Sequence, residues 1–328
     1  MVKTILITGG AGFIGSNFIH HWNKKYPADR LICLDALFVG SDPDNLSGLP
    51  HPAKLTFIHS DIRNKKLIAK LFKKYQFNFV VHFAAESHVD RSLQNPAPFF
   101  DINVIGTNVL LEATRDFKIK RFHYVSTDEI YGDIKSGTAT ENWPFRPTNP
   151  YSISKAAADM LTQSFGRAWG LPYSISRCSN NFGPRQHNEK FLPRMILLAL
   201  QNKKLTIYGS GQQKRDWLYV LDHCRGIEKI LLNKKAEGQI YNIGGGVSKT
   251  NLAVAKMILH HLGKPESLLT YVADRPGGDF RYSLSGQKIK IDLGFIPKTN
   301  FTRDLAQTIE WYKQNFLSNF PYSLIRAN

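Results

Sequence analysis

A glycine-rich turn near the N-terminus constrains the fold more than any other feature of this chain. The residues from Thr8 to Gly15, TGGAGFIG, follow a short apolar run and precede a helical pattern. In such a strand, turn and helix, Gly9 permits the tight turn and Gly12 lets the backbone approach a pyrophosphate. Gly15 then allows the helix to pack on the strand. The turn therefore predicts a dinucleotide site at the positive end of the helix.

An acidic residue at the end of the next apolar run indicates which dinucleotide binds. Asp35 lies 20 residues after Gly15, where a carboxylate can accept hydrogen bonds from a ribose diol and would repel a 2′-phosphate. Ala36 and Leu37 follow it, so no arginine is placed to accept such a phosphate. The sequence predicts NAD rather than NADP.

The first half of the chain alternates short apolar runs with helical patterns, which is typical of βαβ units in a parallel sheet. We predict an α/β fold: a Rossmann-type doubly wound parallel sheet with a smaller C-terminal α/β lobe that binds substrate. The expected division is 1–180 for the NAD-binding domain and 181–328 for the lobe, some of whose elements can return to the main sheet. The expected strands are Thr4–Thr8, Leu31–Leu34, Leu55–Ile58, Phe79–Phe83, Phe122–Val125 and Tyr173–Cys178, and the expected helices are Phe13–Lys25, Lys65–Tyr75, Val104–Phe117 and Tyr151–Gly170.

A tyrosine and a lysine stand four residues apart in the last of these helices. The spacing places Tyr151 and Lys155 on one face. The lysine charge is expected to lower the phenol pKa from its usual value of about 10, which would make Tyr151 a usable base.

These features resemble the extended short-chain dehydrogenase/reductases, and within them the sugar-nucleotide 4,6-dehydratases. The segments that carry the resemblance span nearly the whole chain: 82–92 (HFAAESHVDRS), 126–132 (STDEIYG), 177–184 (RCSNNFGP), 215–220 (RDWLYV) and 274–277 (DRPG). Asp128 and Glu129 distinguish a dehydratase from an epimerase, because removal of water needs an acid and a base in addition to hydride transfer.

The resemblance implies a role for each catalytic residue. Tyr151 would take the C4 hydroxyl proton while NAD accepts the hydride, with Lys155 beside it and Thr127 bonded to the C4 oxygen. Glu129 would remove the C5 proton and Asp128 would protonate the leaving C6 hydroxyl. Two carboxyl groups so close together are expected to have divergent pKa values. The product would be a 4-keto-6-deoxy sugar nucleotide.

The same reasoning gives two sets of binding residues. The cofactor set comprises Gly9, Gly12, Phe13, Ile14, Gly15, Asp35, Ala36, Leu37, Asp61, Ile62, Phe83, Ala84, Ala85, Ser87, Tyr151, Lys155 and Asn181. The substrate set comprises Ser87, Thr127, Asp128, Glu129, Asn180, Lys190, Phe191, Tyr208, Arg215, Asn251, Asp274 and Arg275. No metal ligand is expected.

The nucleotide base stays open between thymine and uracil. Arg185, Gly278 and Phe280 depart from the usual family residues, and most departures lie where the nucleotide should bind. The resemblance favours dTDP-glucose, with UDP-glucose as the alternative. An epimerase, another enzyme of the family or a non-catalytic NAD-binding protein are further alternatives.

The net charge of +17 raises the alternative of a nucleic-acid binder. The lysines, however, come in short pairs scattered along the chain, without an aromatic and basic motif, and so predict a solvated surface rather than a nucleic-acid partner. Three cysteines without metal-ligand spacing, no signal peptide and no long apolar run predict a cytoplasmic protein without a membrane partner. The resemblance also implies a homodimer paired through 104–117 and 151–170.

Overall fold

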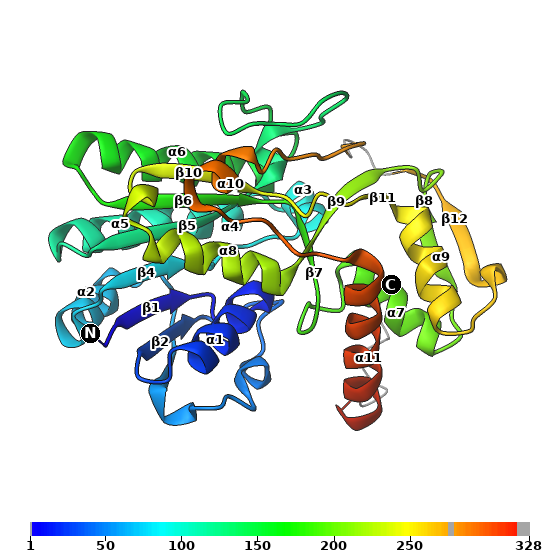
Figure 1. Cartoon of the computed structure of the whole chain (residues 1–328), viewed down its shortest axis with the longest axis horizontal. Helices are drawn as coiled ribbons and strands as arrows, with labels where there is room; N and C mark the ends of the chain where they lie inside the picture. The colour runs from blue at the N-terminus through cyan, green and yellow to red at the C-terminus, as the bar shows by residue number, and fades with distance from the viewer. Residues whose placement is uncertain (1, 275–278, 320–328) are drawn as a thin grey trace.

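A seven-stranded parallel sheet forms the centre of the larger lobe (Figure 1). The computed structural model describes residues 2–274 and 279–319. The strand order is β10-β6-β5-β4-β1-β2-β3, so the direction of strand succession reverses between β1 and β4. Ligands bind at such a switch point, beyond the carboxyl ends of the strands. The strands are β1 (Thr4–Thr8), β2 (Arg30–Asp35), β3 (Leu55–His59), β4 (Phe79–His82), β5 (Arg121–Thr127), β6 (Tyr173–Cys178) and β10 (Gln239–Ile243).

Helices cover both faces of this sheet because its strands are apolar on both sides. On β1, Ile5 and Ile7 pack with Trp22 of α1 in one core cluster, whereas Leu6 packs with Leu110 of α5 in another. One face carries α1 (Phe13–Lys25) and α8 (Val220–Leu232), and the other carries α2 (Lys65–Tyr75), α5 (Thr107–Asp116) and α6 (Pro150–Trp169). The predicted Rossmann-type fold is confirmed.

The smaller lobe has its own core around Trp217, Phe301 and Leu192. Its three-stranded sheet has the order β11-β9-β7, and a separate parallel pair joins β8 to β12. The elements are β7 (Asn180–Phe182), α7 (Phe191–Leu200), β8 (Leu205–Tyr208), β9 (Lys214–Tyr219), β11 (Ser248–Thr250), α9 (Asn251–His261), β12 (Leu269–Val272) and α11 (Phe301–Asn319). In Figure 1 this lobe lies to one side of the main sheet, beyond the ends of its strands.

Short helices connect the larger elements. They include α3 (Val89–Gln94), α4 (Ala97–Phe100), a π-helical segment η3 (Asp101–Gly106), the 3₁₀ turn η4 (Asp128–Tyr131) and α10 (Gln287–Leu293). The helix expected over 104–117 therefore starts as a π-helix and becomes α-helical only at Thr107. The helix expected over 151–170 runs from Pro150 to Trp169, and most strand ends lie within two residues of their expected positions.

The main sheet draws on both halves of the chain. The strand β10 pairs with β6 in register, with Ile243 opposite Cys178, and α8 packs against α1. Both elements follow residue 180 in sequence. The division at that residue stays a prediction.

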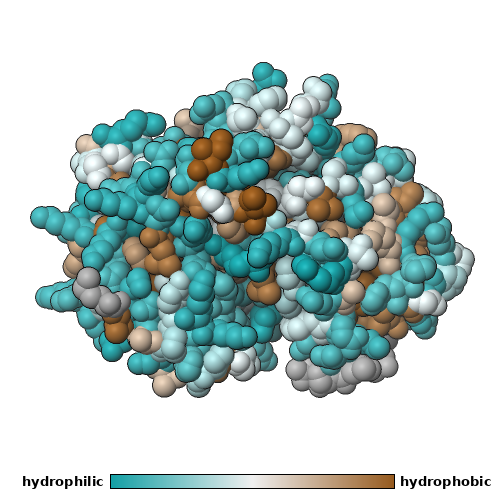
Figure 2. All heavy atoms as spheres, in the orientation of Figure 1, coloured by the Kyte–Doolittle hydropathy of each residue, from teal (hydrophilic) through white to brown (hydrophobic). Residues whose placement is uncertain are grey.

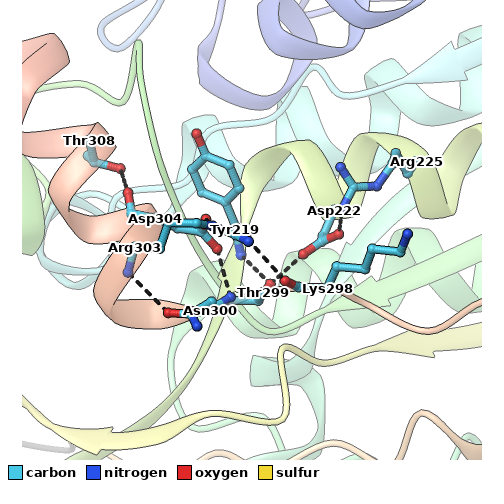
Figure 3. Close-up of polar contacts among 9 residues, drawn as sticks. All are labelled: Tyr219, Asp222, Arg225, Lys298, Thr299, Asn300, Arg303, Asp304 and Thr308. Carbon is cyan, nitrogen blue, oxygen red and sulfur yellow. Dashed lines mark hydrogen bonds and ion pairs between the residues drawn. The ribbon is translucent and has the colours of Figure 1, made fainter.

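A polar cluster fixes α11 beside the end of β9 (Figure 3). Thr299 Oγ1 donates to Asp222 Oδ2 at 2.7 Å and accepts from the Tyr219 backbone N–H at 3.2 Å. Asp304 is buried and accepts from the Asn300 N–H at 2.8 Å, in the first turn of α11. The cluster anchors the C-terminal helix of the smaller lobe to α8, which belongs to the larger lobe.

The face of the molecule drawn in Figure 2 is largely hydrophilic. Figure 2 shows polar residues over most of one face of both lobes, with apolar residues in small separate areas. Among the described residues, no helix combines the length and apolar character needed to cross a bilayer.

Three histidines buried in the neutral form predict a stability that falls in mild acid. His82, His123 and His223 are at most 1% exposed, and burial lowers the pKa of each to about 3. The unfolded chain takes up protons below about pH 6.5 while the folded one does not, so the free energy of unfolding falls as the pH drops from about 6.5 towards 3. Three such protons give a slope of up to about 4 kcal/mol per pH unit. Urea unfolding at pH 7, 6 and 5 measures this slope.

Two histidine variants test whether the buried histidines cause this slope. His123→Gln is expected to reduce the slope by one proton, whereas the same change at the exposed His260 is expected to leave it unchanged. A free energy of unfolding that stays constant between pH 7 and pH 5 would contradict this prediction.

Candidate active site

Two cavities meet at the carboxyl ends of the main strands. The first follows the glycine turn and the ends of β2, β4 and β5, and the second lies between α3, β8, β9 and α7. They share seven lining residues: Ser87, Glu129, Asn180, Asn181, Gln186, Glu189 and Lys190. A molecule in one cavity can therefore touch a molecule in the other.

The structure brings nearly all predicted site residues to these cavities. Of the cofactor set, all except Leu37 line the first cavity. Thr127 and Asp128 of the substrate set also line the first, whereas the second is lined by Ser87, Glu129, Asn180, Lys190, Phe191, Tyr208, Arg215, Asn251 and Asp274. Arg275 lies outside the described residues.

The glycine turn has the shape that a dinucleotide needs. Gly9 has a φ of +68°, and a Cβ there would come within 2.5 Å of the Ala84 backbone nitrogen. A Cβ at Gly15 would overlap the Gly9 carbonyl oxygen. The helix α1 begins after Gly12 with no side-chain cap and no acidic residue in its first turn. Its free N–H groups therefore face the cavity and fit a pyrophosphate.

Asp35 is held in place by the backbone at the end of β2. Its Oδ2 accepts from the Ala11 N–H at 2.9 Å and from Ser41 Oγ at 3.3 Å, and its Oδ1 accepts from the Leu37 N–H at 2.9 Å. A carboxylate offers about four acceptor positions, so Oδ1 can still accept one bond from a ribose hydroxyl. Leu37 itself contributes through its backbone and not as a cavity wall.

The two adjacent carboxyl groups sit on the turn that follows β5. Thr127 Oγ1 accepts from the Glu129 N–H and donates to Asp128 Oδ1, both at 3.3 Å, and so caps η4. Asp128 is 3% exposed, and its Oδ2 has no hydrogen-bond partner among the residues that the structure describes. Such a buried orphan needs either a proton or a ligand as its partner.

The environments of these carboxyl groups differ. Burial, together with Glu129 and Asp216, raises the pKa of Asp128 well above its usual range. Burial also raises the pKa of Glu129, but Arg215 and Lys190 oppose that rise. A proton shared between the two groups is therefore held more readily by Asp128 than by Glu129, which provides an acid and a base in one site.

The start of α6 positions the phenol and the ammonium. Asn149 and Ser152 form a reciprocal capping box that fixes the first turn, which contains Tyr151. Lys155 Nζ donates to the Val125 carbonyl at 2.7 Å and lies 4.3 Å from the centre of the Tyr124 ring. Burial lowers the pKa of Lys155 to about 8.

The expected fall in the Tyr151 pKa is wrong for this structure. Burial, together with Glu129 and Cys178 nearby, raises the pKa of the phenol well above 10. The spacing of Tyr151 and Lys155 correctly predicts a shared face, but it carries no information on desolvation or on the carboxylate across the cavity.

The second cavity has a cationic side. Arg215 donates to the carbonyls of Asp279 at 3.0 Å and Phe280 at 3.2 Å, and its guanidinium lies 4.6 Å from the Tyr282 ring centre. Lys190 Nζ donates to the Ser87 carbonyl at 2.8 Å. Both cations are fixed near Glu129, and the guanidinium suits a diphosphate.

Several cavity residues were not predicted from the sequence. They include Gln186 and Gln213, each with a buried carbonyl oxygen that has no partner within 2–274 and 279–319, and Asp279 and Tyr282, which line the second cavity. They come from loops and strand ends of the smaller lobe, where no local pattern marks a site. The closest signals were the segments 177–184, 215–220 and 274–277, which lie within two residues of Gln186, Gln213 and Asp279 but do not include them.

Comparisons with known proteins agree with this geometry. A family model for GDP-mannose 4,6 dehydratase matches residues 6–308. The dTDP-glucose 4,6-dehydratase of Haemophilus influenzae is 42% identical, over 97% of this chain and 100% of its own length, and that of Escherichia coli is 40% identical, over 95% and 94%. The chain belongs to the GDP-mannose 4,6 dehydratase family. The predicted family resemblance is confirmed.

Solved structures extend the comparison to the site. DesIV, a dTDP-glucose 4,6-dehydratase from Streptomyces venezuelae, was solved with NAD and TYD bound. Its sequence is 43% identical to this chain, and the two structures superpose with a TM-score of 0.91. The match covers 95% of this chain and 97% of the DesIV chain. The dehydratase fold thus extends over both lobes and both cavities.

Proposed function

We propose that this chain converts dTDP-glucose to dTDP-4-keto-6-deoxy-glucose with NAD as a tightly held cofactor. The observation that carries the proposal is the placement of Asp128 and Glu129. They differ in their tendency to hold a proton, and they line the cavities together with Tyr151. Relatives over nearly the whole chain are dTDP-glucose 4,6-dehydratases, and structures from this group hold NAD.

The first cavity would hold NAD, with the pyrophosphate at the start of α1 and a ribose at Asp35. When bound, oxidised NAD would accept the hydride from C4 of the sugar and later return it to C6. Tyr151 lines this cavity, and positive charge bound there would favour loss of its phenol proton.

The protein residues would move the protons. Tyr151 would take the proton of the C4 hydroxyl, with Lys155 stabilising the phenolate through its charge. The C4 ketone acidifies the C5 hydrogen, which Glu129 would remove. Asp128 would give its proton to the C6 hydroxyl, which leaves as water. Glu129 would then return a proton to C5, and the cycle closes when Tyr151 releases the proton that it took and Asp128 takes one up.

The second cavity would hold the nucleotide, with Arg215 on the diphosphate. A thymine methyl group contributes only about 1 kcal/mol of burial, so UDP-glucose remains the second candidate substrate. Incubating the protein with each nucleotide sugar in parallel and following the loss of one water by mass spectrometry tests both. We expect faster loss from dTDP-glucose. Loss of water from neither sugar would overturn the proposal.

We also propose a homodimer formed through the helices beside the active site. Large apolar side chains are exposed on α3, η3 and α6, with exposed fractions of 53% for Leu93, 55% for Ile105 and 56% for Met160. Helix α6 packs against both α3 and η3, and exposed apolar residues of this size on adjoining helices mark an interaction surface. A cytoplasmic location is proposed as well, supported by three buried free cysteines.

A charge in the middle of this surface is expected to split the dimer. Met160→Glu should shift the protein from dimer to monomer in sedimentation velocity or light scattering, since it would bury a carboxylate in an apolar interface. Ile291→Glu is the control, because Ile291 is 78% exposed and lies on α10, which packs against β10. A monomeric wild type, or an unchanged dimer in Met160→Glu, would contradict the proposed interface.

A further inference from the structure

A buried ion pair joins α6, the helix that carries Tyr151 and Lys155, to strand β6 of the main sheet. Arg177 on β6 and Asp159 on α6 form a two-pronged contact, with Nε to Oδ2 and Nη2 to Oδ1 both at 2.9 Å. Their side chains are 2% and 0% exposed. Among the ion pairs of the described residues, this one is the most deeply buried, since no other has both partners so fully enclosed.

The guanidinium has a second set of partners on another element. Its Nη1 donates to the Tyr131 hydroxyl and to the Glu141 carbonyl, both at 2.8 Å. The Tyr131 hydroxyl in turn donates to Asn242 Oδ1 on β10 at 2.9 Å. The rings of Tyr131 and Phe145 also flank the guanidinium, with centres at 5.3 and 4.7 Å.

The two sets of partners belong to the two elements that carry the chemistry. Asp159 follows Lys155 by one helical turn and Tyr151 by two turns of α6. Tyr131 ends η4, the same short turn that begins with Asp128 and Glu129. Arg177 is thus a single side chain that bonds directly to both elements.

A contribution to the stability of the fold does not by itself explain a buried ion pair of this kind. Removing two charges from water is costly, and apolar residues of similar volume often serve a buried position as well or better. A forked guanidinium with fixed partners instead specifies direction and distance. What a buried, fully bonded network provides is a single arrangement of the elements that it joins.

We propose that Arg177 is a positioning residue, which sets the placement of the Tyr151 and Lys155 pair relative to the Asp128 and Glu129 pair. This inference rests on the proposed function, in which one bound sugar must meet both pairs within a single turnover. A small displacement between them would leave oxidation possible and make the loss of water slow, because the two steps use different pairs.

Tyr131→Phe is the primary test, since it keeps the ring beside the guanidinium and removes only the hydroxyl bonds. With dTDP-glucose we expect kcat to fall between about 10- and 100-fold, with KM changed less than about twofold. The fraction of enzyme-bound NADH at steady state, read by its absorbance, should rise. Without substrate, amide hydrogen exchange over 128–132 should become faster, while the thermal unfolding midpoint stays close to that of the wild type.

Arg121→Lys is the matched control. Arg121 is also buried, at the opposite end of β5, and contacts Glu237 at 3.4 Å and the Ile230 carbonyl at 3.5 Å. It contacts neither catalytic element in these bonds. We expect this change to lower the unfolding midpoint without raising the NADH fraction, and Arg177→Lys to raise that fraction further than Tyr131→Phe.

The outcomes are distinguishable. A wild-type NADH fraction and unchanged exchange over 128–132 in Tyr131→Phe would overturn the positioning role. The positioning role would also be overturned if Tyr131→Phe and Arg121→Lys lowered kcat by the same factor and lowered the folded fraction equally. The network would then serve only the stability of the fold. A wild-type protein that removes water from no nucleotide sugar would overturn the proposed function, while the exchange measurement would still test whether the network fixes η4.

Discussion

Tyr151→Phe is expected to lower the rate at which bound NAD is reduced by dTDP-glucose by about 1000-fold. The change removes the only atom of the side chain that can accept the C4 hydroxyl proton, and it leaves the ring to fill its buried place. Because the first step fails, no NADH should accumulate during the reaction. Stopped-flow absorbance after mixing with dTDP-glucose measures this step.

Tyr75→Phe provides the control for this change. Tyr75 ends α2 and lines neither cavity. Its variant should reduce bound NAD at the wild-type rate. A wild-type rate in Tyr151→Phe would show that another group takes the C4 proton.

Glu129→Gln is expected to have an equally large effect on a different step. Glutamine keeps the shape of the side chain but cannot accept the C5 proton. Oxidation at C4 should therefore proceed and NADH should appear, while the release of water falls by about 1000-fold. Absorbance of NADH and mass spectrometry of the sugar, recorded on one reaction, separate the two steps.

The control and the pH dependence sharpen this prediction. Glu112→Gln changes a surface glutamate that pairs with Lys65 at 2.6 Å and should leave both readouts unchanged.

Burial raises the pKa of Glu129, so below that pKa the carboxyl group is protonated and cannot act as a base. Elimination in the wild type should thus decline on the acid side at a higher pH than an ordinary glutamate would give. Normal turnover in Glu129→Gln would contradict its role.

Local patterns were sufficient for the cofactor half of the molecule. The turn from Gly9 to Gly15 and the strand that ends at Asp35 are consecutive in sequence, so their spacing alone predicts where they meet. Thr127 and Tyr151 are likewise placed by the ends of one strand and the start of one helix. These elements are long and regular enough to be predicted from local sequence patterns, without knowledge of their tertiary contacts.

Contacts between distant segments could not be predicted in the same way. Nothing near Gln239–Ile243 indicates that this strand completes the main sheet beside β6. The pairing of Arg177 with Asp159 depends on the register between α6 and the sheet, and the direction of the Tyr151 pKa shift depends on how deeply that site is buried. Each of these is a property of packing and not of a motif.

The most direct test of the central claim follows one hydrogen atom. If NAD stores the hydride within a single turnover, dTDP-glucose carrying deuterium at C4 should give a 4-keto-6-deoxy product with that deuterium at C6. In a mixture with unlabelled substrate the label should stay on the molecules that carried it, and the recovered cofactor should be unlabelled NAD. Loss of the label to water, or its transfer to other product molecules, would contradict the account.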